Sequence, residues 1–298
     1  MKVSVFVVTY NQENYIRQAL DSILMQQVNF DFEVVIGDDA STDATGYICD
    51  EYASRFSCIH VWHHRINIGI RDNWQFVLNH CRGKYIAMLE GDDYWTDSLK
   101  LQKQVDFLDS HPNCNLCFTN VVLVDEQGLP IEEKILLPNK ADYYSPKDIY
   151  SKWICLTGSV MMRNIITPVH YSDSIYITDT YTFLLVMQNT MAYCMSDVTT
   201  AYRRHGKNVS KDTSVRHACS MATQYRYMAK CFPQKELKNI SRRKENDYLE
   251  QIIYVPYFKG QWKYRFRYMW LHPQLLFSAF MTTTILSYTP IRKLKKKK

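Results

Sequence analysis

The sequence lacks both of the glycine-rich motifs that commonly bind phosphates. No G-x-G-x-x-G follows its first apolar stretch, so the dinucleotide-binding fingerprint is missing. No G-x-x-x-x-G-K-[ST] occurs anywhere in the chain, which excludes a P-loop. A diphosphate bound by this protein must therefore be held by something other than a glycine-rich loop.

A secretory signal and a disulfide framework are also missing. The N-terminal stretch MKVSVFVVTYN has too short an apolar run for a signal and no small-residue cleavage site. The 9 cysteines are scattered and odd in number, which favours a reducing compartment. Cys114 and Cys117 form one CxxC, but no second pair and no His follows at zinc spacing, so a metal role is not expected there. We therefore expect a cytoplasmic protein.

An excess of one charge is found only near the C-terminal end. The net charge is +6, and much of the excess lies in residues 292–298. A local basic tail does not indicate nucleic-acid binding by the whole chain, and we expect no nucleic-acid partner. The length of 298 residues, with 46% hydrophobic and 22% charged residues, predicts one elaborated globular domain, or one domain plus an appendage. The aromatic share of 14% is high and suits contact with carbohydrate or a membrane interface.

Apolar strands and amphipathic helices alternate along the first third of the chain. Alternation at this spacing is typical of right-handed βαβ units, which build a parallel sheet. The predicted strands are Val3–Val8, Phe32–Ile36, Ile59–Trp62 and Gly83–Leu89. Helical apolar stripes lie between them, with Asn11 and Ser41–Asp43 as candidate N-caps. We predict an α/β fold with a Rossmann-like, mostly parallel sheet flanked by helices.

Polar residues follow each predicted strand. They are Thr9-Tyr10-Asn11, Asp38-Asp39, Asn67 and Asp92-Asp93, in chain order. The carboxyl ends of parallel strands meet at one edge of a sheet, and ligands of open α/β sheets bind just outside that edge. These side chains should therefore form one polar rim, into which a mononucleotide fits.

The fourth strand ends in three closely spaced carboxylates, those of Glu90, Asp92 and Asp93. Like charges at this spacing raise the pKa of at least one group, so the cluster is costly without a cation. Hard divalent cations such as Mg²⁺ prefer oxygen ligands and commonly bridge them to substrate phosphates. We interpret the cluster as a metal site. An acidic turn that caps the following helix, predicted at Ser98–Ser110, is the alternative.

The second half contains further elements at less regular spacing. The predicted strands are Cys114–Val124, Thr157–Met162 and Ala192–Met195, and a helix is predicted over Tyr181–Met191. The segment from Gln127 to Pro146 is polar and loop-like. Residues 212–262 have the pattern of charged helices without a catalytic signature.

The C-terminal tail differs in character from the rest. Residues Leu275–Tyr288 are apolar, and the chain ends in the basic run Lys295–Lys298. The apolar stretch is short for a membrane-spanning helix, which needs about 20 residues. A helix in the membrane plane, held to anionic lipid by the basic run, fits better. A helix packed on the domain with a solvated basic tail is the alternative.

Four motifs follow one another in the N-terminal half: VSVFVVTYNQENYIRQALDSIL, FEVVIGDDASTDAT, NIGIRDNW and GKYIAMLEGDDYWTDSLKLQKQ. In this order and spacing they closely resemble the family 2 glycosyltransferases. The match is dense over residues 2–112 and continues through SDSIYITDTYTFLL and AYRRHG to about residue 210. The resemblance implies a GT-A fold, a nucleotide-diphosphate sugar donor, a divalent metal (Mn²⁺ or Mg²⁺) and inversion at the anomeric carbon.

The resemblance also implies roles for individual residues. The residues that it places at the donor are Thr9, Tyr10, Asn11, Glu13, Asp39, Asn67, Arg71 and Asp92. Among them, Asp39 matches the carboxylate that reads the imide N–H of uracil. Asp92, Asp93 and His205 match the metal site, although Glu90 stands at the first position of the family's acidic motif. Asp179 matches the general base, preceded by Thr178 where the family usually has Glu.

Spacing alone leaves other interpretations of three of these residues open. An Asp at a helix start, such as Asp179, is more often a cap than a base. His205 is also compatible with a solvated loop histidine, and Arg71 with a surface position on a helix. Inversion needs a base on the face opposite the leaving group. Because the acidic cluster belongs to the first half of the chain, the base is expected to approach from the second half, where Asp179 lies.

The leading hypothesis is inverting transfer from a UDP-sugar to a lipid-linked or surface-polysaccharide acceptor, on the inner face of the cell membrane. A nucleotidyltransferase also uses paired carboxylates, but it needs a glycine-rich phosphate loop that VVTYNQEN lacks. A nucleotide-sugar-binding protein without catalysis is the third possibility. We expect a nucleotide-sugar-binding half over 1–112, an acceptor-binding and catalytic half of the same domain over 113–211, and a helical extension over 212–298.

Overall fold

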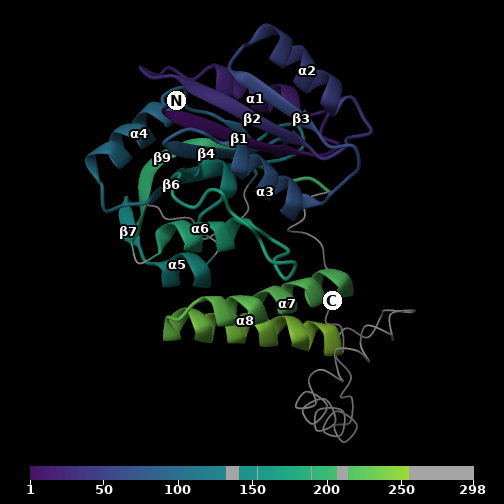
Figure 1. The fold of residues 1–298 in the computed structure, drawn as a ribbon, viewed down its shortest axis with the longest axis vertical. Coiled ribbons are helices and arrows are strands. Elements are labelled where there is room, and N and C mark those ends of the chain that lie inside the picture. The colour runs from purple at the N-terminus through teal and green to yellow at the C-terminus, as the bar shows by residue number, and fades with distance from the viewer. Residues whose placement is uncertain (132–140, 153, 189, 207–213, 255–298) are drawn as a thin grey trace, which may run out of the picture.

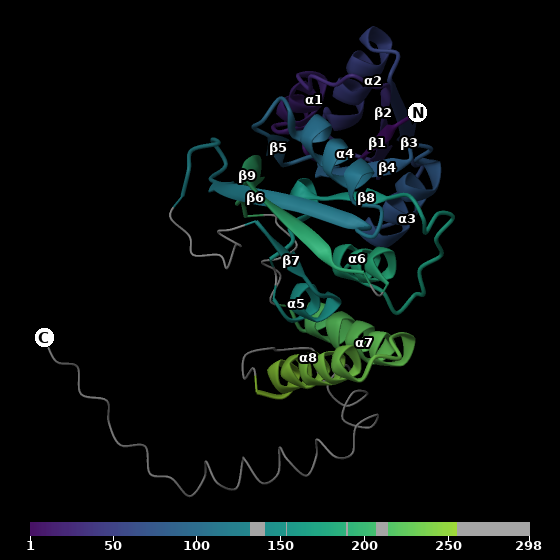
Figure 2. The same ribbon diagram turned by 90° about the vertical axis from the view of Figure 1, so that its left-hand side faces the viewer.

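The computed structural model describes residues 1–131, 141–152, 154–188, 190–206 and 214–254. Within these ranges the chain forms one nine-stranded mixed sheet with helices on both faces (Figures 1 and 2). Along the sheet the strands are β3 (Ile59–His63), β2 (Phe32–Asp38), β1 (Val3–Thr9), β4 (Tyr85–Glu90), β8 (Met161–Arg163), β6 (Leu116–Val124), β9 (Ala192–Arg203) and β5 (Tyr94–Trp95), with β7 (Asp142–Tyr144) paired to β9.

The N-terminal half is the parallel part of the sheet, as predicted. Strands β3, β2, β1 and β4 pair in parallel, and all four lie where the apolar runs predicted them. Successive side chains of a strand point to opposite faces. Val3, Val5 and Val7 accordingly pack with helices α1 (Ile16–Leu24), α2 (Thr45–Arg55) and α4 (Lys100–Ser110). Phe6 and Val8 pack on the other face, against α3 (Ile70–His80).

The predicted helix caps behind β1 and β2 are only partly present. Asn11 does not cap α1, which begins at Ile16; it adopts a positive φ of 52° instead. Its backbone N–H donates to the Ser41 hydroxyl, and its Oδ1 accepts from Thr42 N. Asp43 Oδ1 accepts from Thr45 N at the start of α2. Asn11 thus joins the two loops, whereas Asp43 contacts the start of α2.

The second half adds antiparallel strands and departs further from prediction. Residues Thr157–Ser159 form a 3₁₀ turn, and only Met161–Arg163 of the predicted strand pairs, antiparallel to β4 and β6. Strand β9 runs to Arg203, well beyond the predicted end at Met195. Polar residues interrupt the apolar pattern after Met195, so the sequence did not predict this continuation. They lie at a bulge, where Asn120 Nδ2 donates to Met195 O and Ser196 O. Strand β7 lies in a segment predicted as loop.

Helices of the second half cover the face of the sheet that α3 occupies. Helix α6 (Asp179–Met187) starts two residues before its predicted beginning and ends before Gln188, which has a positive φ. Helix α5 (Pro146–Ser151) packs on α6 and on α8 (Lys235–Tyr254), which forms a hairpin with α7 (Val215–Cys231). Both views show this hairpin as a layer beneath α5 and α6 (Figures 1 and 2).

The predicted helical pattern over 212–262 is confirmed for α7 and α8. The predicted apolar helix at Leu275–Tyr288 and the basic run Lys295–Lys298 lie outside the described residues. None of the helices within the described residues has the length and apolar content that crossing a membrane requires.

Strand directions bring distant segments to one edge of the sheet. Strand β6 is antiparallel to β8, which is antiparallel to β4, and β9 is parallel to β6. Strands β1, β2, β4 and β9 therefore all point the same way. The residues that follow each of them meet at one edge, and the candidate site lies there.

Candidate active site

A cavity of about 1260 Å³ opens at this edge of the sheet. One side is made by the residues that follow β1, β2 and β4, and the other by η1 (Thr157–Ser159), α6 and the α7–α8 hairpin. Of the residues predicted from sequence, those that line it are Thr9, Tyr10, Asn11, Asp39, Asn67, Asp92, Asp179 and His205. Residues from both halves of the chain therefore share one space.

The loop after β1 lies beside the acidic residues that end β4. Thr9 is buried, and its hydroxyl donates to Gln12 Oε1 at 2.8 Å. Gly91, between the acidic residues, packs tightly on this pair: a Cβ there would lie 2.4 Å from Gln12 Oε1 and 2.9 Å from Thr9 Oγ1. The close approach explains why glycine separates Glu90 and Asp92. Tyr10 remains 46% exposed at the mouth.

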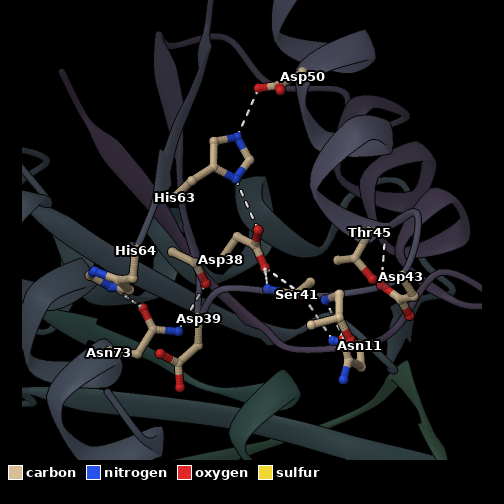
Figure 3. A network of polar contacts seen from close by, with 12 residues as sticks. Asn11, Asp38, Asp39, Ser41, Asp43, Thr45, Asp50, His63, His64 and Asn73 are labelled. Carbon is tan, nitrogen blue, oxygen red and sulfur yellow. Dashed lines mark hydrogen bonds and ion pairs between the residues drawn. The ribbon is translucent and has the colours of Figure 1, made fainter. Parts of the chain in front are cut away.

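The two aspartates after β2 have different surroundings (Figure 3). Asp38 accepts from Ser41 and contacts His63 Nδ1 at 2.9 Å, so it holds the loop together. Asp39 lines the cavity, and its two oxygens accept from Ile68 N at 2.7 Å and Gly69 N at 2.9 Å. Asn67 donates to the Asp39 carbonyl oxygen at 3.1 Å. The contacts fix Asp39 while leaving it acceptor lone pairs.

Three carboxylates, those of Glu90, Asp92 and Asp179, line the cavity. Burial, together with the charges of Asp92 and Asp179, raises the pKa of Glu90 to about 8. Burial also raises the pKa of Asp179, although hydrogen bonds from Thr180 counteract this. Several acids held together without a compensating charge are arranged either to bind a cation or to hold protons.

Asp92 is paired within the cavity to the residue that follows β9. His205 Nε2 lies 2.8 Å from Asp92 Oδ2, and the imidazole stacks on the Tyr15 ring with centroids 5.3 Å apart. The imidazole is 7% exposed. His205 is therefore a fixed part of the site rather than a solvated loop residue.

Asp93 is not brought into the cavity, although it was predicted to hold the metal. Its side chain is buried, and Oδ1 accepts from Arg203 N at 2.8 Å. Burial and the charges of Asp92 and Glu90 raise its pKa well above the usual range, which favours the protonated form. Asp92 thus lines the cavity, whereas Asp93 is buried beside Arg203 N.

Arg203 fastens the acidic loop to the rest of the site. Its guanidinium donates to the carbonyl oxygens of Asp92, Asp125 and Glu126 at 2.9, 3.2 and 2.8 Å. It also donates to Gln18 Oε1 at 2.6 Å and lies over the Tyr15 ring. Arg203 is 2% exposed and has a structural role.

Asp179 occupies the first position of α6, where it both contacts a helix N–H and lines the cavity. Its Oδ1 accepts from Thr180 N. Other residues from the second half that line the cavity are Lys152, Tyr225, Lys244 and Tyr248. The capping role and the position at the cavity are therefore both present.

Two residues predicted at the donor do not reach the cavity lining. Glu13 Oε2 accepts from Ala44 N at the start of α2. Arg71 forms ion pairs with Asp72 and Asp173 at 2.7 and 2.9 Å. Both residues support neighbouring loops in this conformation.

Sequence reasoning missed the part of the cavity made by α7 and α8. His217, Met221 and Tyr225 follow one another at four-residue spacing, as do Lys244 and Tyr248. This spacing places them on one helix face, but the same pattern describes any buried face, so it could not reveal a cavity.

Comparison with solved structures defines the class of the fold. The structure of S. aureus TarS 1-349 in complex with UDP-GlcNAc superimposes with a TM-score of 0.64 at 20% identity, over 86% of this chain and 73% of that one. The mannosyltransferase PcManGT from Pyrobaculum calidifontis, in complex with GDP-Man and Mn²⁺, superimposes with a TM-score of 0.58 at 16% identity, over 96% of this chain and 84% of that one. The predicted GT-A fold is thereby confirmed.

The sequence then identifies the family. The family model described as "Glycosyl transferase family 2" matches residues 4–163, and this chain belongs to that family. An uncharacterized protein from Mycobacterium tuberculosis is 36% identical over 208 residues, covering 70% of this chain and 60% of that protein. TuaG from Bacillus subtilis, provisionally named as a teichuronic acid biosynthesis glycosyltransferase, is 30% identical over 221 residues. The match covers 70% of this chain and 82% of TuaG. The match thus spans less than two thirds of the mycobacterial relative.

Proposed function

We propose that this protein transfers a sugar from a UDP-sugar to a hydroxyl group of a saccharide acceptor, with inversion at the anomeric carbon. The observation that carries the proposal is the convergence of Asp39, Asp92 and Asp179 on one cavity, from three separate segments of the chain. The nucleotide sugars in the TarS and PcManGT complexes support a donor of this chemical class.

In this proposal the nucleotide binds along the ends of β1 and β2. Asp39, already oriented by Ile68 N and Gly69 N, accepts a hydrogen bond from the imide N–H of uracil. Thr9, Tyr10, Asn11 and Asn67 surround the base and ribose. Glu13 and Arg71 contribute indirectly, by holding the neighbouring loops.

The residues at the end of β4 fit a divalent cation. Asp92 offers a carboxylate and His205 an imidazole, and the charges of Asp92 and Asp179 add to burial in raising the pKa of the nearby Glu90. Within the described residues, no group of three or more His, Cys, Asp or Glu side chains is arranged to hold an ion by itself. The donor diphosphate would therefore supply the remaining ligands. Bound Mn²⁺ or Mg²⁺ would neutralise charge on the departing diphosphate. We assign Asp93 to supporting this loop.

Asp179 acts as the general base. Its carboxylate takes the proton of the acceptor hydroxyl while that oxygen bonds to the anomeric carbon and the diphosphate oxygen leaves with the bonding electrons. A carboxylate with a raised pKa is a better proton acceptor than one with the usual value. The acceptor then lies on the α6 side of the cavity, opposite the diphosphate.

We further propose that the acceptor belongs to a lipid-linked or surface polysaccharide and that the reaction occurs at the inner face of the cell membrane. The name of TuaG, which refers to teichuronic acid biosynthesis, supports a polysaccharide acceptor. The UDP-GlcNAc complex of TarS supports a hexose or an N-acetylhexosamine as the transferred sugar.

The first experiment is a thermal-shift panel of nucleotide sugars with and without Mn²⁺, followed by a UDP-release assay. We expect one UDP-sugar to stabilise the protein in a Mn²⁺-dependent manner and to release UDP. Asp92→Asn should abolish both effects. Stabilisation without any UDP release, across a range of saccharide acceptors, would instead identify a nucleotide-sugar-binding protein without catalysis.

A further inference from the structure

The α7–α8 hairpin closes the cavity on the side of the molecule opposite α1 and α2 (Figures 1 and 2). The hairpin lies beyond residue 163, where the family match ends. Tyr225 of α7 and Lys244 and Tyr248 of α8 all line the cavity. The hairpin is therefore a wall of the site and not only a support for α5.

The hairpin presents aromatic surface to the cavity. The rings of Tyr225 and Tyr248 stack with centroids 5.7 Å apart and an interplanar angle of 23°. His217 meets the edge of Tyr248 at 6.1 Å and that of Tyr176 at 5.5 Å. Aromatic rings with polar tips combine an apolar face with hydrogen-bonding groups. A sugar ring has the matching combination of C–H faces and hydroxyl edges.

Lys244 places a positive charge within this aromatic wall. Its ammonium nitrogen lies 5.1 Å from the centroid of the Tyr150 ring and 5.4 Å from that of Tyr225. Within the described residues, no carboxylate lies within ion-pair distance of it. Burial lowers its pKa, and repulsion from Arg243 adds to this effect. A partly buried cation without an ion-pair partner is costly unless a ligand supplies the anion.

The carboxylates that influence the pKa of Lys244 differ, apart from Asp179, from those that influence the pKa of Glu90. The carboxylates that counteract the lowering of the Lys244 pKa are those of Asp179 and Asp247. The charges of Asp92 and Asp179, by contrast, raise the pKa of Glu90. Asp179 thus influences the pKa of both Glu90 and Lys244, and a second lysine, Lys152, also lines the cavity.

We propose that the α7–α8 hairpin forms the acceptor subsite and that Lys244 selects a saccharide carrying an anionic group, a carboxylate or a phosphate. The sugar ring stacks on Tyr225 and Tyr248, and the anionic group meets the ammonium of Lys244. A hydroxyl of the same saccharide then faces Asp179. This assignment rests on the proposed glycosyl transfer and specifies the chemical class of its acceptor.

The test measures ligand binding rather than turnover. Full-length protein saturated with UDP and Mn²⁺ is titrated calorimetrically with methyl glucuronoside, glucose 6-phosphate and methyl glucoside. The occupied donor site prevents the probes from binding there. We expect at least one anionic probe to bind ten-fold or more tightly than the neutral glucoside. The two anionic probes distinguish a uronic acid from a sugar phosphate as the preferred acceptor.

Three variants locate the preference. Lys244→Met keeps the length and apolar stem of the side chain, and we expect it to abolish the preference for the anionic probes while UDP affinity is unchanged. Lys238→Met, at an exposed position of the same helix, is the matched control and should bind like wild type. Lys244→Arg should retain a preference, which shows that the positive charge is the cause. Thermal midpoints of all variants establish that they fold.

Equal affinity for charged and neutral probes would overturn the proposal, and so would a preference that persists in Lys244→Met. A ten-fold loss of UDP affinity in Lys244→Met would assign the cation to the donor diphosphate and would also overturn it. In each of these cases the proposed glycosyl transfer stands. If wild-type protein does not bind UDP at all, the proposed function itself fails.

Discussion

Single carboxylates decide the chemistry of this site, because neighbouring acids in the chain face different surroundings. Asp38 binds Ser41 and His63, while Asp39 reaches the cavity. Asp92 faces His205, while Asp93 is turned inward. A pair of adjacent aspartates is therefore not one functional unit. Each residue has to be tested separately.

The base is the first residue to test. Asp179→Asn should lower the rate of UDP-sugar-dependent transfer by about 10²–10⁴-fold, the usual contribution of general-base catalysis. UDP affinity should be kept, because the base contacts the acceptor and not the nucleotide. Asp31→Asn, at an exposed position, is the control and should transfer at the wild-type rate. Full activity in Asp179→Asn would assign the carboxylate to helix capping alone.

The raised pKa of Glu90 predicts how stability depends on pH in the absence of added metal. The unfolded chain loses this proton near the ordinary pKa of 4.5, whereas the folded protein keeps it until about 8. The folded state therefore binds more protons between these values, and stability is lost as pH rises from 4.5 through about 8.

Thermal midpoints measured from pH 5 to 9 should accordingly fall with rising pH, and Glu90→Gln should make the fall shallower. Glu250→Gln, at an exposed position on α8, should leave the profile unchanged. A wild-type midpoint that rises over this range would show that the Glu90 pKa is not raised.

At the scale of elements, β9 positions two residues that contact the loop after β4. The strand carries Arg203 at its end, and His205 follows it, so its register fixes both the acidic loop and the imidazole. The contacts of the guanidinium reach Gln18, Asp92 and the turn at Asp125. One side chain thus holds three segments in place.

Arg203→Lys should weaken this arrangement, because an ammonium cannot make the same fork of hydrogen bonds. Each buried carbonyl oxygen left without a donor costs about 1–3 kcal/mol. We expect a lower free energy of unfolding in denaturant titrations and weaker Mn²⁺-dependent UDP binding. Arg242→Lys, on the exposed face of α8, serves as the control. Unchanged UDP binding in a destabilised Arg203→Lys would limit the role of Arg203 to stability.

At the scale of the whole molecule, the cavity lies between a nucleotide-binding sheet edge and a helical layer that the family motifs do not cover. In the proposed function the donor contacts residues among the first 92, and the proposed acceptor wall comes from residues 152–248. This division allows the acceptor preference to change without disturbing the donor site. The predicted division of the chain into functional parts at residues 112 and 211 stays a prediction.

The basic run Lys295–Lys298 gives a prediction for the full chain at a membrane. Basic residues near an anionic bilayer contribute about 1 kcal/mol each, and salt screens the attraction. We expect the full-length protein to co-sediment with vesicles containing phosphatidylserine at low salt and to be released at high salt. A chain ending before Trp270 should stay in the supernatant. Equal sedimentation of the two chains would remove the tail as the membrane contact.

The elements that the sequence predicted are those governed by short-range patterns. The four parallel strands follow from apolar runs, and the polar rim follows from where those runs end. The 3₁₀ turn at Thr157–Ser159 and the bulge in β9 were not predictable in the same way, because each depends on partners far along the chain. Asn120 and Ser196, for example, are joined across the bulge.

The sequence by itself determined the α/β fold, the family and the order in which polar side chains arrive at the sheet edge. These follow from periodicity and from fixed rules for connecting parallel strands. Only the tertiary structure decided which aspartate of each pair faces the cavity, since Asp93 is held by Arg203 N, 110 positions later. It also decided that Lys244 and its aromatic neighbours line the cavity. A helical pattern shows which residues share a face of the helix, but not whether that face packs in the core or lines a cavity.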